Sequence, residues 1–213
     1  MAPNYADGDL PSFLVLLAAP GVPGHEVLKE QMRQILLSEG ISPKETERIC
    51  TAQAQLLDAV LANGSDEELL KKVMVLQDLQ FKANGMDESM TNEQKAEIAE
   101  AALLSMKDPW MDSFLRMDPR DALRKVVMPV LAVNGTLDTQ VFYEQNLPEI
   151  ERVLNESGRK PTIMQVDGLN HLLQPAVTGA VSEYVRIDIT MDENIMSAIA
   201  DWINELPLEN AKP

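Results

Sequence analysis

Three short apolar runs constrain the fold of this chain more than any other feature, because each one ends at a turn that contains glycine. The runs are Ser12 to Ala19, Val127 to Val133 and Thr162 to Val166, and they lead into Pro20-Gly21, Asn134-Gly135 and Asp167-Gly168. Runs of this length with such endings are typical of buried strands. Continuous hydrophobicity, without alternation, indicates strands of a parallel sheet that are covered on both faces. The sequence therefore predicts an α/β protein with about three parallel strands and flanking helices.

The segment between the second and third runs predicts a single helix from Tyr143 to Ser157. Leu147, Ile150 and Leu154 recur there at helical spacing, and Gly158 follows as a stop. A strand, a helix and a strand in this order imply a right-handed crossover between two parallel strands.

The segment between the first and second runs is far longer, at roughly 100 residues, than the single helix that such a crossover needs. Helical patterns occur at about 26–39, 43–62, 66–83 and 92–106, with a shorter piece around 110–117. Ser42 before Pro43, Ser65 before an acidic turn, and Thr91 with Gln94 are helix start signals. We interpret this stretch as a helical cap insertion. The predicted organisation is a first strand in residues 1–24, the cap in 25–125, and the remaining strands and helices in 126–213, closing with a helix over Glu193 to Leu206.

Charge and composition limit the partners and the cofactors. With 18 Lys and Arg against 34 Asp and Glu, the formal net charge is −16, so the average surface repels phosphate backbones and anionic lipids. We expect no nucleic-acid partner and no membrane partner. The two histidines, His25 and His171, are too few and too distant in sequence for a multi-histidine metal site. We expect no metal and no cofactor, a structural role for His25, and burial of the single cysteine, Cys50, in a cap helix.

The apolar run near the N-terminus has the length of a signal-peptide core but the wrong flank. Asp7 and Asp9 precede it, and no Lys or Arg does, whereas a signal peptide carries positive charge there. No run approaches the ~18 apolar residues of a membrane-spanning helix. We expect a soluble chain that is cytoplasmic by default, and its localisation is otherwise unknown.

Two side chains with catalytic chemistry follow the second and third predicted strands. Asp138 comes after the second strand in Asn-Gly-Thr-Leu-Asp, and His171 follows the third in Asp-Gly-Leu-Asn-His. Parallel strands place both residues at the same edge of the sheet. Catalytic and ligand-binding residues of open α/β sheets lie at this edge. A carboxylate there can orient an imidazole and stabilise its protonated form. Each residue alone is more typical of a turn or an exposed loop, and the order Asp then His on consecutive strand ends is the informative feature.

At this point the chain resembles the α/β-hydrolases with a helical cap, in particular the bacterial serine-peptidase-like and esterase-like members. The matching segments are FLVLLAAPGVPG from Phe13, DPW from Asp108, PVLAVNG from Pro129 with Asp138, and GLNH ending at His171. The resemblance runs from about Phe13 to the C-terminal helix. It implies that the three strands correspond to the sixth, seventh and eighth of the family's sheet, with the cap after the sixth. It also implies that Asp138 and His171 are the acid and base of a catalytic triad.

The family's nucleophile motif, Gly-x-Ser-x-Gly, does not occur in the 213 residues. In that family it lies on a turn upstream of everything matched here, and the two backbone donors of the oxyanion hole also lie outside this sequence. We therefore expect the C-terminal part of a capped α/β-hydrolase, a truncated product or a fragment, that is inactive alone. A small ester or peptide is the expected substrate only if another segment completes the site.

Two other functions stay open. The chain can be an interaction module that forms a homo-oligomer, or pairs with a complementing N-terminal half, through the apolar strand edge of Phe13 to Leu17 or through cap helices. It can also be a small-molecule binder. The methionines of the cap and Trp110 are the only features of the sequence that favour this function.

Overall fold

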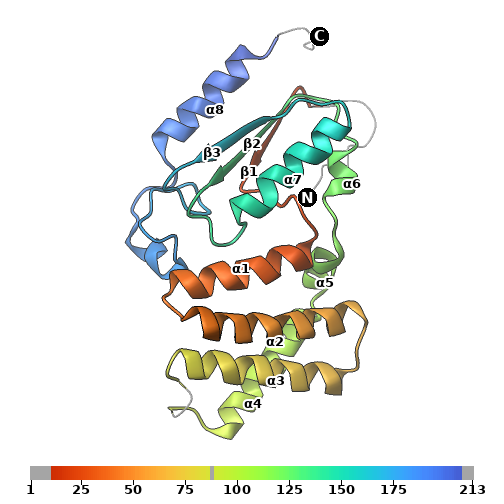
Figure 1. Ribbon diagram of the computed structural model, residues 1–213, viewed down its shortest axis with the longest axis vertical. Helices are drawn as coiled ribbons and strands as arrows, with labels where there is room; N and C mark the ends of the chain where they lie inside the picture. Colours follow the sequence, from red (N-terminus) through yellow and green to blue (C-terminus); the bar gives the residue numbers. More distant parts are fainter. Residues whose placement is uncertain (1–10, 87–88, 208–213) are drawn as a thin grey trace. The chain divides into compact units, whose positions relative to one another are not determined.

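The computed structural model describes residues 11–86 and 89–207 and divides into two compact units (Figure 1). Of the described residues, the sheet unit contains 11–22 and 118–207, and the helical unit lies between Pro23 and Met117. Residues 118–125, which the sequence pattern placed in the insertion, group with the sheet unit.

The sheet has three parallel strands in the order β1 (Leu14–Leu17), β2 (Val130–Gly135) and β3 (Thr162–Val166). Leu14 lies opposite Val130, and Leu131 lies opposite Thr162. The prediction of an α/β protein with three parallel strands is therefore confirmed, and β3 has the predicted bounds.

Two helices cover the two faces of this sheet (Figure 1). α7 (Tyr143–Glu156) joins β2 to β3 and packs its apolar side chains, Ile150 among them, against one face. α8 (Glu193–Glu205) contributes Ile195 and Trp202 to the cluster on the other face. The indole of Trp202 contacts the ring of Phe13 edge to face at 6.1 Å and donates a hydrogen bond to Thr162 Oγ1.

Of the three described strands, β2 alone is buried along its whole length. All six residues of β2 are buried, whereas β1 and β3 are partly exposed, and Leu17 at the end of β1 is 43% exposed. The expectation that the first apolar run is buried throughout was wrong. The physical reason is that β1 and β3 are the outer strands of the described sheet.

The helical unit contains five helices among its described residues. They are α1 (Gly24–Ser38), α2 (Pro43–Leu61), α3 (Asp66–Ala83), α4 (Asn92–Met106) and α5 (Pro109–Arg116). Ser42, Ser65 and Thr91 cap α2, α3 and α4 with their side-chain oxygens, as predicted. Cys50 is buried in the core of this unit, and burial raises the pKa of its thiol. In the part of the chain that the structure describes, no helix is long and apolar enough to cross a membrane.

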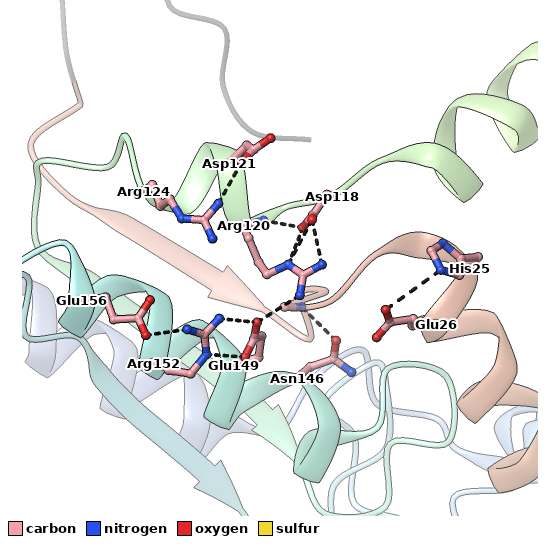
Figure 2. Close-up of polar contacts among 11 residues, drawn as sticks. His25, Glu26, Asp118, Arg120, Asp121, Arg124, Asn146, Glu149, Arg152 and Glu156 are labelled. Atoms are coloured by element: carbon pink, nitrogen blue, oxygen red, sulfur yellow. Dashed lines mark hydrogen bonds and ion pairs between the residues drawn. The ribbon is translucent and has the colours of Figure 1, made fainter.

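The chain leaves the sheet unit on one segment and returns to it on another. Polar contacts join each of these segments to α7 (Figure 2). The backbone N–H of Gly21 donates to Asn146 Oδ1 at 2.8 Å. On the returning segment, Arg120 of the short α6 (Arg120–Leu123) pairs with Asp118 at 2.8 Å and with Glu149 at 3.4 Å. The sequence pattern did not predict α6, which has only one turn.

Candidate functional site

Asp138 lies in the loop that follows β2, and both oxygens of its carboxylate have hydrogen-bond partners. Its side chain has no exposed area. Oδ1 accepts the backbone N–H groups of Gln140 and Val141, both at 2.8 Å, and Oδ2 lies 2.9 Å from Nδ1 of His171. Hydrogen bonds from the backbone compensate for burying this carboxylate and fix its orientation.

His171 lies in the loop that follows β3, two residues before a left-handed backbone position. Leu173 has φ 56° with its side chain buried, and the Oδ1 of the buried Asn170 accepts the backbone N–H groups of Leu172 and Gln174 at 3.0 Å. These contacts hold the turn that presents the imidazole, whose side chain is 26% exposed. Because a carboxylate only accepts hydrogen bonds, Asp138 places the ring proton on Nδ1 and leaves the lone pair of a neutral imidazole on Nε2.

The two loops touch each other where they leave the sheet. Leu137 N donates to Leu169 O at 3.0 Å, and a Cβ added to Gly135 would lie 2.0 Å from that same oxygen. Thr136 Oγ1 donates to Asp167 and accepts the backbone N–H of Gly168, both at 2.9 Å. The glycine in Asn134-Gly135 is therefore required by the close approach of the loop that carries His171.

An open depression with a volume of about 580 Å³ lies beside His171 in the sheet unit. We call it the His171 groove. Its lining is mostly apolar and comes from Leu17, Leu172, Leu173, Ile187, Ile189 and Met191, with Gln174, Asp188 and Thr190 as the polar members besides the histidine. An imidazole at the wall of an apolar depression can exchange a proton with a group bound there.

Tyr184 adds a contact that the sequence did not predict. It belongs to a 3₁₀ segment, η2 (Val181–Arg186), and its hydroxyl oxygen accepts a hydrogen bond from Gln140 Nε2 at 3.1 Å. Burial raises the pKa of Tyr184, and the charge of Asp138 acts in the same direction, so the phenol stays protonated at neutral pH. No motif marks this tyrosine, because η2 has no helical or strand periodicity.

The other candidate residues lie elsewhere. His25 belongs to the helical unit, with Nδ1 3.1 Å from Leu115 O, as expected of a structural histidine. No serine lines the groove in the described ranges, 11–86 and 89–207. Within those ranges no group of three His, Cys, Asp or Glu side chains is arranged to hold a metal.

The structure of an esterase is among the solved structures that resemble this chain. No protein-family model and no curated protein sequence matches the chain. The crystal structure of the esterase RhEst1 from Rhodococcus sp. ECU1013 aligns with 92% of this chain at 16% sequence identity and a TM-score of 0.37. The aligned part is 57% of that esterase chain, so this chain spans little more than half of its length. A match of this size does not assign an activity.

Proposed function

We propose that Asp138 and His171 are the acid and general base of a hydrolase site for ester or peptide substrates, whose nucleophile comes from outside these 213 residues. The observation that carries the proposal is the 2.9 Å contact between His171 Nδ1 and the fully buried carboxylate of Asp138. Few structural roles need a buried carboxylate oriented on a partly exposed imidazole at the carboxyl edge of a parallel sheet.

In this proposal Nε2 of His171 takes the proton of an attacking hydroxyl and then gives it to the leaving group. Asp138 keeps the ring in the Nδ1–H tautomer and stabilises the imidazolium that forms between the two steps. Positioned acid–base catalysis of this kind contributes roughly 10² to 10⁴ in rate.

The chain alone is then expected to lack turnover. The sequence contains no Gly-x-Ser-x-Gly motif, and no serine of the described residues lines the His171 groove. Without an activated nucleophile and an oxyanion hole, an oriented histidine has no covalent step to assist.

The first experiment measures hydrolysis of short-chain p-nitrophenyl esters and aminoacyl nitroanilides by the purified 213-residue chain. We expect no turnover above that of a His171→Ala variant. Turnover that His171→Ala abolishes and His25→Ala leaves intact would refute the claim that the nucleophile comes from elsewhere. His25→Ala is the matched control, because His25 lies in the helical unit.

The second experiment reads the codons upstream of Met1 for an in-frame Gly-x-Ser-x-Gly and expresses the extended chain. If that protein is a hydrolase, we expect His171→Ala and Asp138→Ala to remove most of its kcat. Hydrolysis that survives His171→Ala undiminished would rule out His171 as the base.

A second function, self-association through β1, has its own supporting observation. Backbone bonds from Leu14 N to Pro129 O and from Ala18 N to Val133 O face β2. Because N–H groups alternate in direction along a strand, those of Val15 and Leu17 point to the opposite edge. β1 pairs only with β2 among the described residues, so this edge is open to another strand. We propose that the chain pairs there with a second copy or with a complementing N-terminal half.

Sedimentation velocity at micromolar concentration tests self-association. Val15→Pro removes an outward N–H and leaves the bonds to β2 in place, since proline is tolerated on strand edges. We expect oligomers for the wild type and monomers for Val15→Pro. A wild type that is monomeric throughout the micromolar range would refute the homo-oligomer.

A further inference from the structure

We infer that Gln174 is a positioning residue that holds one wall of the His171 groove against the loop carrying the imidazole, and that the groove so built takes the uncharged, apolar end of a substrate. The inference rests on the proposed function, because it names the substrate class of that same site.

The wall is the segment 187–191, which we call the strap. Ile187, Ile189 and Met191 are its apolar members in the lining of the groove. The strap lies between η2 and α8 and belongs to neither of them. Backbone groups outside helices and strands still need hydrogen-bond partners, so the position of the strap depends on the segments that supply them.

Two hydrogen bonds tie the strap to the loop of His171. Gln174 Nε2 donates to the carbonyl oxygen of Ile189 at 2.6 Å, in the middle of the strap. The backbone N–H of Asp192 donates to Leu173 O at 2.9 Å, directly after the strap ends. The first of these bonds comes from a side chain, so a substitution can remove it without changing the backbone.

The same side chain is also held next to the histidine. Gln174 Oε1 accepts Nδ2 of Asn170 at 3.0 Å, and the backbone N–H of Gln174 donates to Asn170 Oδ1 at 3.0 Å. Gln174 is 6% exposed and Asn170 is fully buried. A buried amide whose atoms all have partners is a rigid link, because each broken bond would leave a polar atom unsatisfied. Gln174 therefore joins the residue before His171 to the strap.

The charge and lining of the groove define what it can bind. The side-chain amide of Gln174 is used inside the protein, and among the described residues that line the groove Asp188 is the one with an acidic side chain. This acid and the formal net charge of −16 both oppose an anionic ligand. The mostly apolar lining favours an uncharged apolar group, for which each buried CH₂ adds roughly fourfold in affinity.

The test measures the binding of hexanamide and acetamide to the full chain by nitrogen-15 shifts of the His171 imidazole. Hexanamide has the longer alkyl chain, and we expect it to bind at least about tenfold more tightly, since an open groove buries only part of that chain. Gln174→Met keeps the side-chain volume and removes both bonding atoms. The ligand must then order the strap itself, so we expect the affinity for hexanamide to fall roughly fivefold, the factor of one ordinary hydrogen bond. Gln165→Met is the matched control, because Gln165 lies on β3 and does not line the groove.

A second variant, Gln174→Glu, separates this role from a general loss of structure. Above neutral pH its carboxylate still accepts Asn170 Nδ2 but cannot donate to Ile189 O, so only the tie to the strap is cut. We expect the same fall in affinity, an unchanged Nδ1–H tautomer of His171, and circular dichroism equal to wild type. Wild-type affinity for hexanamide in both Gln174 variants, or no advantage of hexanamide over acetamide, would refute this inference alone. The proposed function fails separately, if hydrolysis by the completed protein survives His171→Ala undiminished.

Discussion

Replacing Gly179 by alanine separates the strain of a left-handed backbone from the effect of a steric clash near the site. Gly179 and Gly168 have almost the same backbone torsion, with φ of 71° and 72°. A Cβ at Gly168 would meet nothing within 4 Å, whereas a Cβ at Gly179 would lie 2.0 Å from the carbonyl oxygen of Leu137. Gly168→Ala is therefore a matched control for Gly179→Ala.

The expected magnitudes follow from this difference. Each alanine adds left-handed strain of about 1 kcal/mol, and each gains the same small entropy from a stiffer unfolded chain. Gly179→Ala must also move the Leu137 oxygen by about 1 Å to reach 3.0 Å, the shortest separation that real Cβ atoms show. Overpacking of that kind costs about 1 to 3 kcal/mol. We expect free energies of unfolding to fall by about 1 kcal/mol for Gly168→Ala and by about 2 to 4 kcal/mol for Gly179→Ala.

Urea unfolding followed by circular dichroism measures both values, with equal m-values as the condition for comparing them. Because Leu137 precedes Asp138, we also expect Gly179→Ala to weaken the contact between Asp138 and His171, visible in the imidazole tautomer. Equal destabilisation by the two alanines would refute the reasoning, since it would show that the close approach to Leu137 carries no energy.

Three further outcomes are expected. Asp138→Asn turns an amide donor toward Nδ1, so the His171 ring should change to the Nε2–H tautomer in nitrogen-15 spectra, and retention of Nδ1–H would contradict the assigned contact. The pKa of Glu183 is lowered by the backbone N–H groups of Thr178 and Val177. The stability from this carboxylate is therefore present above its ordinary pKa of 4.5 and is lost as the pH falls below it, so Glu183→Gln should flatten the acid limb of urea midpoints against pH. Thr91→Ala removes the capping box of α4 and should lower the free energy of unfolding by about 1 kcal/mol, and an unchanged urea midpoint would contradict that role.

The helices and strands that the sequence predicted correctly are those whose limits depend on local chemistry. α3 begins at Asp66 and α4 at Asn92, as expected, because Ser65 and Thr91 satisfy the first backbone N–H groups from within three residues. The third strand runs from Thr162 to Val166, as expected, because a Gly-containing turn follows it.

The features that sequence patterns did not predict depend on partners that are distant in the chain. Gln140 and Tyr184 are 44 residues apart, and the sequence alone gives no reason to pair them. The exposure of Leu17 likewise depends on which strands pair with β1, and the composition of the first run does not contain that information. The approach of Asp138 to His171 was predictable because parallel strands place their carboxyl ends together, which needs topology and no detail of side chains.

The open strand edge and the proposed site are connected through Leu17. This residue ends β1, whose outer edge pairs with no strand of the described residues, and it also lines the His171 groove. A strand that pairs in parallel with β1 has its carboxyl end beside Leu17, so the turn that follows it lies next to the imidazole. An antiparallel strand would place its amino end there. We therefore expect a partner that completes the site to pair in parallel with β1, and Val15→Pro to remove both association and hydrolysis by the completed protein. Loss of association without loss of hydrolysis would show that the nucleophile reaches His171 by another route.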